Sequence, residues 1–192
     1  MSVIIGEAQT VELCGRLSFV QFAAPTRSSL DEYQLFAQQT HTLAERINVR
    51  HGDSNWRPVC LIAEHQDSES VIRHYRGADC CVVTSLHDGM NLVAKEFTAT
   101  RDDEQGTLVL SQFTGAAREL DNALIVNPYN VEETADAIYR GLTMSREEQA
   151  VHMRSIIRED NVYRWAANML LDASRLRRAE RISARIVSRE ER

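Results

Sequence analysis

The sequence predicts an α/β protein with a doubly wound, mostly parallel sheet of the Rossmann type. Short apolar runs alternate with longer amphipathic stretches about five times along the 192 residues. Most of these runs are apolar at nearly every position, which is typical of parallel strands that are covered on both faces. Polar or glycine-containing segments separate the runs from the amphipathic stretches and predict the turns between strands and helices.

The first two predicted strands flank a long helix. Residues 17–23 begin with alternating apolar and polar residues, and Pro25 ends this strand. Residues 28–32 contain two serines followed by two acids, a helix-start signature, and apolar residues then recur at helical spacing to about Asn48. Residues 58–63 are a short apolar run, which predicts a buried strand.

A short helix and a third strand come next. Residues 68–76 predict the helix, and Gly77 is expected to close it as a C-cap. The inward face of this helix is expected to contain Val71, Ile72 and Tyr75. Residues 80–84 are again apolar and predict another buried strand.

The second half of the chain continues the alternation. It predicts helices at residues 91–100, 115–120 and 132–142 and strands at residues 107–110 and 123–126. The packing candidates on the first of these helices are Leu92, Val93, Phe97 and Ala99. Ser145 and Glu148 form a capping signature for a last helix that is expected to run past Ile157.

Two regions are expected on this basis: a Rossmann-like domain at residues 1–160, and a C-terminal helix with a charged tail at residues 161–192. The tail from residue 175 onward is rich in arginine and glutamate and predicts an exposed helix or a frayed terminus. The helix at about residues 162–178 is expected to be mobile or to expose an apolar patch.

Composition excludes several classes of function. The formal net charge of -6 argues against general nucleic-acid binding, which usually requires a basic surface. No apolar run approaches the length of a membrane span, and no signal peptide is evident, so a cytoplasmic protein is expected. The four cysteines lack zinc-ligand spacing and are expected to be reduced and buried, and no cluster of side chains predicts a metal.

The most informative segment for function follows the third predicted strand, because ligands of open α/β sheets bind beyond the carboxyl ends of strands. There Asp88 and Gly89 form a turn, and a helix begins at Met90 or Asn91. Gly89 permits positive φ and close approach of a ligand, and the free N–H groups of residues 90–93 suit a pyrophosphate. The alternative is an ordinary turn followed by a solvated helix face, on which Lys95 and Glu96 would lie.

Asp88, just before the predicted helix, is placed to accept hydrogen bonds from sugar hydroxyls. Glu96, about one and a half turns into that helix, is placed to reach a ribose diol.

Three other loops fall at the same predicted edge of the sheet. Arg27 suits a phosphate, although a surface arginine paired with Asp31 is the alternative. The loop at residues 64–68, with His65, could meet a base edge or simply connect two elements.

The loop at residues 111–115 is the fourth candidate. Ser111, Thr114 and Gly115 could line the cleft, or Thr114 could only cap a helix. His65 and His87 both lie in predicted loops on the ligand side, and neither is assigned as catalytic.

Four stretches resemble the trehalose-6-phosphate synthase family of retaining glycosyltransferases. They are residues 20–27 (VQFAAPTR), 88–96 (DGMNLVAKE), 109–119 (VLSQFTGAARE) and 123–129 (ALIVNPY). The resemblance covers about residues 17–171, and the second stretch is highly specific. It implies the C-terminal, nucleotide-sugar-binding domain of a GT-B fold.

The resemblance also implies an activity: transfer of glucose from UDP-glucose to glucose 6-phosphate, giving trehalose 6-phosphate without a metal or other cofactor. Asp88 would bind hydroxyls of the donor glucose and is the candidate catalytic residue. Gly89 and the main chain of Met90, Asn91, Leu92 and Val93 would hold the donor. Glu96 would bind the ribose, and Arg27 the acceptor phosphate.

The family's N-terminal domain and its arginine-and-lysine element find no match in this sequence. We therefore expect a partial, donor-binding half with little activity alone, because those groups position the acceptor and stabilise the leaving nucleotide. Two alternatives remain: a relative with another acceptor, such as a glucosylglycerol-phosphate synthase, and a non-catalytic nucleotide-sugar-binding module. Expected partners are the nucleotide sugar and either a separately encoded N-terminal half or a second copy, with no nucleic acid and no membrane.

Overall fold

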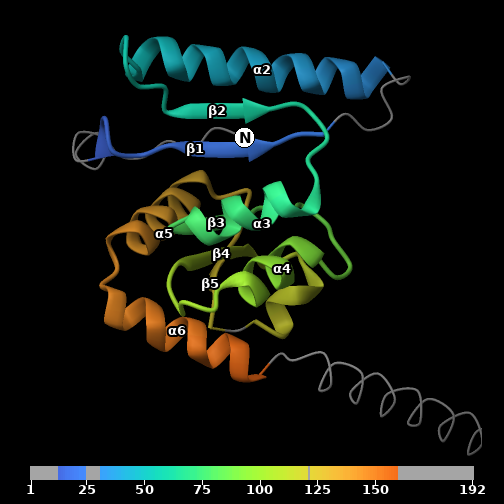
Figure 1. Cartoon of the computed structure of the whole chain (residues 1–192). Helices are drawn as coiled ribbons and strands as arrows, with labels where there is room; N and C mark the ends of the chain where they lie inside the picture. Colours follow the sequence, from blue (N-terminus) through green and yellow to red (C-terminus); the bar gives the residue numbers. More distant parts are fainter. Residues whose placement is uncertain (1–12, 25–30, 121, 160–192) are drawn as a thin grey trace, which may run out of the picture.

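The computed structural model describes residues 13–24, 31–120 and 122–159, in which strands alternate with helices (Figure 1). In chain order the elements are β1 (Phe19–Phe22), α2 (Asp31–His51), β2 (Val59–Ile62), α3 (Ser68–Gly77), β3 (Cys80–Val83), α4 (Leu92–Thr100), β4 (Thr107–Ser111), the 3-10 helix η1 (Gly115–Arg118), β5 (Leu124–Val126), α5 (Val131–Thr143) and α6 (Arg146–Glu159). Each strand and helix expected in this part of the chain is present, with ends that differ by a few residues.

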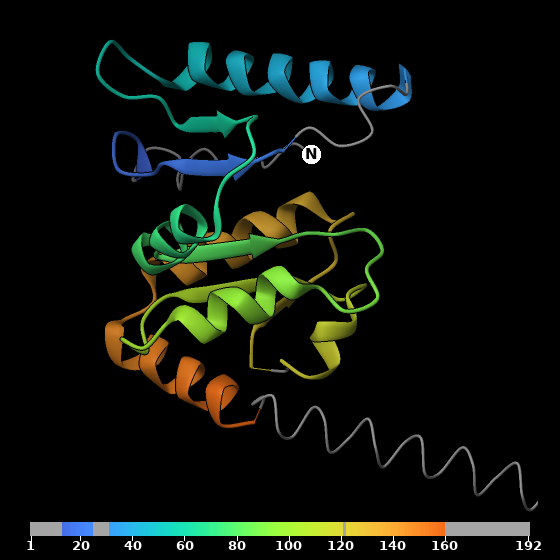
Figure 2. The ribbon, with the colours of Figure 1, turned by 45° about the vertical axis from the view of Figure 1, so that its right-hand side comes forward.

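Every strand pair is parallel, as predicted, but the strands form two sheets. β1 pairs with β2, and the second sheet has the order β3-β4-β5. Hydrogen bonds therefore do not join β1 to β3, and the sheet is not continuous among the described residues. Figure 2 shows the two sheets one above the other, with their strands pointing the same way.

The core lies around β4, the middle strand of the second sheet, all five residues of which are buried. Leu108 and Leu110 project to one face, where they pack in one cluster with Phe97 of α4. Val109 projects to the other face and packs with Ile138 of α5. Helices on both faces thus explain why this strand is apolar throughout.

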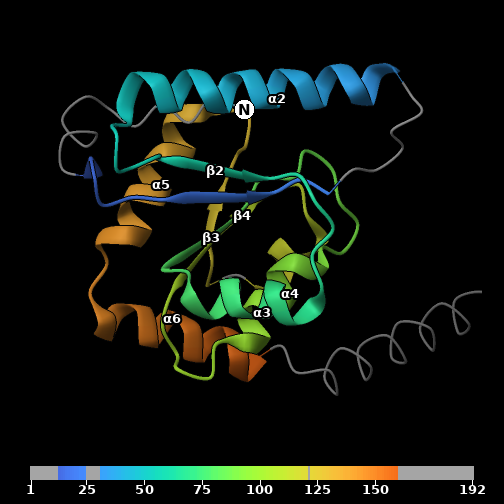
Figure 3. The same ribbon diagram turned by 45° about the horizontal axis from the view of Figure 1, so that its top comes forward.

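The layer formed by α2, β2 and β1 is less buried. Figure 3 shows α2 running along β2, with its first turns extending past the end of the strand. Asn48 of α2 joins the two elements: its Nδ2 donates to the Val59 carbonyl at 2.9 Å, and its Oδ1 accepts from the Val59 N–H at 2.9 Å. The amide of Asn48 thereby pairs both the N–H and the C=O of Val59 on the outer edge of β2.

Two expectations for α3 were wrong, although the helix begins at Ser68 as predicted. Its N-cap is Asp67, whose Oδ1 accepts from the Ser70 N–H at 2.7 Å. Gly77 lies inside the helix, and the C-cap is Ala78 in an extended conformation. Ile72, expected to point inward, is 39% exposed.

A buried arginine replaces a glycine cap at the end of α3. The Arg101 side chain is only 4% exposed, and its Nη1 donates to the carbonyls of Tyr75, Arg76 and Ala78, each at 2.8 Å. Asp103 balances its charge through an ion pair at 2.9 Å. A single cation therefore satisfies the last carbonyls of α3 and ties that helix to the end of α4.

The capping signature before α6 is confirmed. The Ser145 N–H donates to Glu148 Oε2 at 3.0 Å, and the Glu148 N–H donates to Ser145 Oγ at 3.2 Å. These hydrogen bonds lower the pKa of Glu148. The signature at residues 28–32 and the tail at residues 161–192 fall largely or wholly outside the described residues.

The four cysteines are free, but only two are shielded. Cys80 and Cys81 are half-buried in β3, and burial, with the charge of Cys81 and Asp79 added for Cys80, raises the pKa of each thiol to about 12. Cys14 and Cys60 are exposed, which contradicts the expectation that all four are buried. No helix in the described part of the chain is long and apolar enough to cross a membrane.

Candidate donor-binding site

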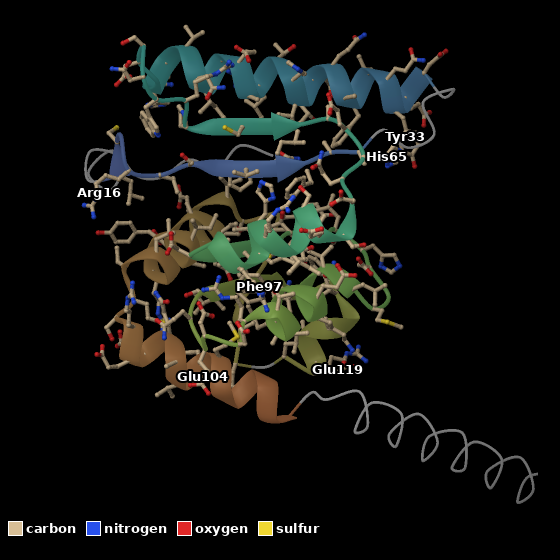
Figure 4. The ribbon with its side chains drawn as sticks, viewed as in Figure 1. Arg16, Tyr33, His65, Phe97, Glu104 and Glu119 are labelled. Atoms are coloured by element: carbon tan, nitrogen blue, oxygen red, sulfur yellow. The ribbon has the colours of Figure 1, made fainter. Side chains whose placement is uncertain are left out.

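The candidate site lies at the carboxyl edge of the second sheet. The strands β3, β4 and β5 end at this edge, the loops that follow them lie there, and α4 begins there (Figure 2). In Figure 4, His65 and Glu119 lie on this side of the molecule, whereas Arg16 and Glu104 lie at the opposite edge. The topology therefore places Asp88 at the edge predicted from the sequence.

The Asp88 carboxylate organises the turn before α4. Its Oδ1 accepts from the N–H groups of Met90 and Asn91 at 3.1 and 2.9 Å, and its Oδ2 accepts from Asn91 Nδ2 at 3.0 Å. Asn91 Oδ1 in turn accepts from the Ala94 N–H at 2.9 Å, which makes Asn91 the N-cap of α4. Asp88 and Asn91 together fix where the helix begins.

The positive φ in this turn belongs to Asn91, at 61°, and not to Gly89 as expected. Asparagine tolerates this region better than most residues because its short side chain can hydrogen-bond locally. A Cβ on Gly89 would meet no atom within 4 Å. Asn91 thus has the backbone conformation that was expected of Gly89.

Two of the four predicted N–H donors remain available to a ligand. Met90 and Asn91 donate to Asp88, as above, whereas the N–H groups of Leu92 and Val93 have no hydrogen-bond partner in the described part of the chain. The two side chains are 59% and 43% exposed, so they are not the packing residues expected. Ala99 is also exposed, and only Phe97 of that predicted set is buried. The first turn of α4 thus presents two free donors with the positive end of the helix dipole.

The loop after β4 holds the Asp88 turn in place through two backbone hydrogen bonds. The Gly115 N–H donates to the Asp88 carbonyl at 2.9 Å, and the Asp88 N–H donates to the Phe113 carbonyl at 3.3 Å. A Cβ on Gly115 would lie 2.0 Å from the Gly89 carbonyl oxygen. The close approach that requires a glycine is therefore at Gly115, where one turn lies directly on the other.

Asp88 is ionised under ordinary conditions. Partial burial raises the pKa of Asp88. The hydrogen bonds from the Asn91 side chain and from the Met90 and Asn91 N–H groups, together with the charge of the nearby His87, lower this pKa by more, so the net shift is downward. The carboxylate thus stays negative while it holds the turn. Each of its oxygens can accept more than one hydrogen bond, so Oδ2 retains a lone pair for a ligand.

Glu96 lies in the second turn of α4 and turns toward α3. The Tyr75 hydroxyl is its hydrogen-bond partner, and burial, the charges of Cys81 and Glu96 and that hydrogen bond raise the pKa of Tyr75 to about 12. Lys95 is ion-paired with Glu119 at the end of η1, so it is not a freely solvated side chain. That pair links α4 to the loop after β4 on its exposed side.

The remaining candidates divide into three groups. Ser111 and Thr114 are buried and bonded within their own turn, Thr114 Oγ1 donating to the Ser111 carbonyl at 2.9 Å, so they shape the loop and do not face a ligand. His65 and His87 are exposed. Arg27 lies outside the described residues.

Sequence reasoning missed an aromatic pair beside the site. The rings of Phe113 and Tyr129 meet edge to face at 5.8 Å and come from the loops after β4 and β5. Each of the two residues follows a predicted strand, and this position in the sequence could have indicated that they lie at the ligand-binding edge. Among the described residues, no group of three or more histidine, cysteine or acidic side chains could hold a metal.

A parallel α/β sheet with a free helix N-terminus at its carboxyl edge defines a Rossmann-type domain suited to phosphate-containing ligands. The model for glycosyltransferase family 20 matches residues 8–175. The chain belongs to that family.

Similar proteins carry related names. A trehalose-6-phosphate synthase of Klebsiella pneumoniae is 41% identical over 162 residues, which are 82% of this chain and 34% of that protein. An alpha,alpha-trehalose-phosphate synthase (UDP-forming) of Pichia angusta is 37% identical over 168 residues, 86% of this chain and 35% of that one. The chain thus spans about a third of the length of these relatives.

Solved structures agree on the fold. A Burkholderia xenovorans alpha,alpha-trehalose-phosphate synthase in complex with glucose-6-phosphate superposes with a TM-score of 0.79 at 38% identity, over 84% of this chain and 36% of that one. An E. coli trehalose-6-phosphate protein bound with UDP-2-fluoro glucose gives 0.76 at 39% identity, over 84% and 37%. The GT-B assignment of the fold is thereby confirmed.

Proposed function

We propose that the first turn of α4 binds the diphosphate of a nucleotide sugar. The observation that carries this proposal is the pair of unpartnered N–H groups on Leu92 and Val93, held in place by Asp88 and Asn91. Two convergent backbone donors at a helix N-terminus suit an anion. They need no metal, so our proposal includes no metal and no other cofactor.

UDP-glucose is the donor we propose, because the relatives are named as UDP-forming and one structure contains UDP-2-fluoro glucose. Glucose 6-phosphate is the corresponding acceptor, as in the Burkholderia xenovorans complex, and trehalose 6-phosphate the product of the complete enzyme. The compartment we propose is the cytoplasm.

Within this proposal each site residue has one role. Asp88 accepts from glucose hydroxyls with its spare lone pair, Glu96 leaves Tyr75 to bind the ribose, and Arg27 binds the acceptor phosphate. Gly89 leaves the loop open to the sugar, since nothing lies near its missing Cβ. A different acceptor, as in a glucosylglycerol-phosphate synthase, is the second candidate.

Calorimetry with UDP-glucose and UDP tests donor binding by the chain. We expect measurable binding of both, and about tenfold weaker binding by Asp88→Ala, because the turn that directs the donors is lost. Arg73→Ala is the matched control, since its partner Glu69 and the pair itself are exposed on α3. Absence of heat at millimolar ligand would refute the donor site.

A coupled assay for UDP release in the presence of glucose 6-phosphate tests the reaction. We expect at most slow turnover by the chain alone, since it spans only about a third of its relatives' length and the Lys95 ammonium beside the proposed diphosphate site is already paired with Glu119. Rapid turnover would show that the chain holds a complete active site.

A further inference from the structure

Tyr75 of α3 is held firmly beside α4. Arg101 Nη1 donates to the Tyr75 carbonyl at 2.8 Å, and the Tyr75 ring meets the Phe97 ring edge to face, with 6.1 Å between the ring centroids. The side chain is half-buried and packs against the core cluster that contains Phe97 and Leu108. These contacts fix the position of the Tyr75 hydroxyl, which donates to Glu96 of α4.

Glu96 is the less constrained partner of this hydrogen bond. Its side chain is exposed, and it forms no ion pair in the described part of the chain. The neighbouring cation, Lys95, is paired with Glu119 instead. When the hydrogen bond breaks, Glu96 is therefore the side chain that moves and Tyr75 is the one that stays.

The position of Glu96 on α4 brings its carboxylate within reach of a ligand at the first turn. Residues three and four apart share a helix face, so Glu96 lies on the same face as Leu92 and Val93. Long side chains on a helix also point back toward its N-terminus. A ribose joined to a diphosphate at that turn therefore meets Glu96 from the solvent side, whereas the bond to Tyr75 holds the carboxylate toward α3.

Tyr75 remains a neutral hydrogen-bond donor at physiological pH. Burial, the charges of Cys81 and Glu96 and the hydrogen bond to Glu96 raise the pKa of its phenol to about 12. A protonated phenol and a sugar hydroxyl each offer one O–H to a carboxylate. The Tyr75 hydroxyl and the hydroxyls of a bound sugar are therefore equivalent competitors for Glu96.

We propose that Tyr75 sets the sugar specificity of the donor site by competing with the ligand for Glu96, an inference that rests on the function proposed above. A ribose has two neighbouring hydroxyls, so it replaces one hydrogen bond by two when Glu96 turns from Tyr75 to the ligand. A deoxyribose offers one hydroxyl, so the exchange is even and brings no gain. The phenol thereby makes the site respond to the diol and not to a single hydroxyl.

Calorimetry of the wild type and Tyr75→Phe with UDP, 2′-deoxy-UDP and 2′,3′-dideoxy-UDP tests this competition. In the wild type, the two deoxy ligands should bind equally and UDP about three- to tenfold more tightly. In Tyr75→Phe a single hydroxyl has no competitor, so 2′-deoxy-UDP should bind about three- to tenfold more tightly than 2′,3′-dideoxy-UDP. UDP should gain by a similar factor, and 2′,3′-dideoxy-UDP should bind both proteins equally.

Two controls separate competition from a general effect on the fold. Tyr139→Phe removes the same hydroxyl from a half-buried tyrosine of α5, on the face of the second sheet where Ile138 packs against Val109, and should leave all three affinities unchanged. In a Glu96→Ala background the contested acceptor is absent, so adding Tyr75→Phe should also change none of the three affinities. Phenylalanine keeps the ring beside Phe97, so the fold should be retained.

A second measurement uses the wild type alone. The ¹³Cζ resonance of Tyr75 reports the hydrogen bonding of its hydroxyl, so UDP should shift it and 2′,3′-dideoxy-UDP should not. Three results would overturn the proposal: UDP binding that leaves this resonance in place, a wild type that prefers 2′-deoxy-UDP to 2′,3′-dideoxy-UDP, or equal changes in all three affinities in Tyr75→Phe. Each of them leaves the donor site standing, whereas no binding of any of these nucleotides would refute the donor site and this proposal together.

Discussion

Asp88 and Asn91 are joined twice: the Asn91 N–H donates to Asp88 Oδ1 at 2.9 Å, and the Asn91 side-chain amide donates to Asp88 Oδ2 at 3.0 Å. Because Asn91 also caps α4 through Ala94, the pair couples the turn to the helix. Leu92 and Val93, whose N–H groups are free donors, are the next two residues in the chain. The geometry of the proposed anion site therefore depends on two side chains that already hold each other.

Substitutions of Asn91 separate backbone conformation from hydrogen bonding. Asn91→Ala should lower the free energy of unfolding by about 2 kcal/mol, since it removes the cap and leaves a residue with a Cβ at positive φ. Asn91→Gly should cost less, because glycine accepts φ of 61°. Chemical denaturation measures both. Equal losses would show that the backbone conformation is not under strain.

The lowered pKa of Asp88 gives a pH dependence. A carboxyl whose folded pKa lies below its unfolded value, about 3.9, stabilises the fold above that value, and this contribution is lost as the pH falls through the folded pKa. The stability advantage of the wild type over Asp88→Asn should be largest at pH 6–7 and shrink below about pH 4. Urea titrations at several pH values measure it, and a constant advantage would contradict the assignment.

Gly115 and Gly89 form a matched pair of glycines in contacting loops. Gly115→Ala places a Cβ 2.0 Å from the Gly89 carbonyl oxygen, so the two turns must separate, at a cost of about 2–3 kcal/mol. Gly89→Ala meets nothing and should leave stability within about 0.5–1 kcal/mol of the wild type. Thermal and urea unfolding of both variants check this contrast. A destabilised Gly89→Ala with an unaffected Gly115→Ala would refute the loop packing described.

Arg101 should be the most sensitive arginine in the described part of the chain. Arg101→Met leaves the carbonyls of Tyr75, Arg76 and Ala78 without their donor and Asp103 without its cation, which should cost about 3 kcal/mol. The control is Arg57→Met, whose ion pair with Glu45 is about half exposed on both sides and should contribute less than about 1 kcal/mol. Similar losses for the two variants would contradict this assignment.

The sequence was sufficient for the alternation of elements because most of the strand runs are apolar at nearly every position. Residues 107–110 are an example: they predict a strand covered on both faces, and β4 is buried throughout. The position of Asp88 also followed, since the carboxyl ends of parallel strands all lie at one edge of the sheet. The specific string at residues 88–96 gave the family.

Other features could not be predicted because they depend on contacts between distant residues. Nothing in the local sequence shows that Asn91 carries the positive φ, since a neighbouring glycine is the usual residue there. Arg101 is separated from the carbonyls it caps by more than twenty residues. The division into two sheets is a matter of which strands pair, and apolar runs do not encode that.

An amide NMR titration of the chain with UDP-glucose tests the proposed diphosphate site at the first turn of α4. We predict that the N–H resonances of Leu92 and Val93 shift downfield on addition, because these groups gain hydrogen bonds to phosphate, while the Gly106 resonance at the opposite edge stays in place. The Gly106 N–H is already bonded to Gln149 at 2.9 Å. Saturable binding that leaves the Leu92 and Val93 resonances unchanged would contradict the account.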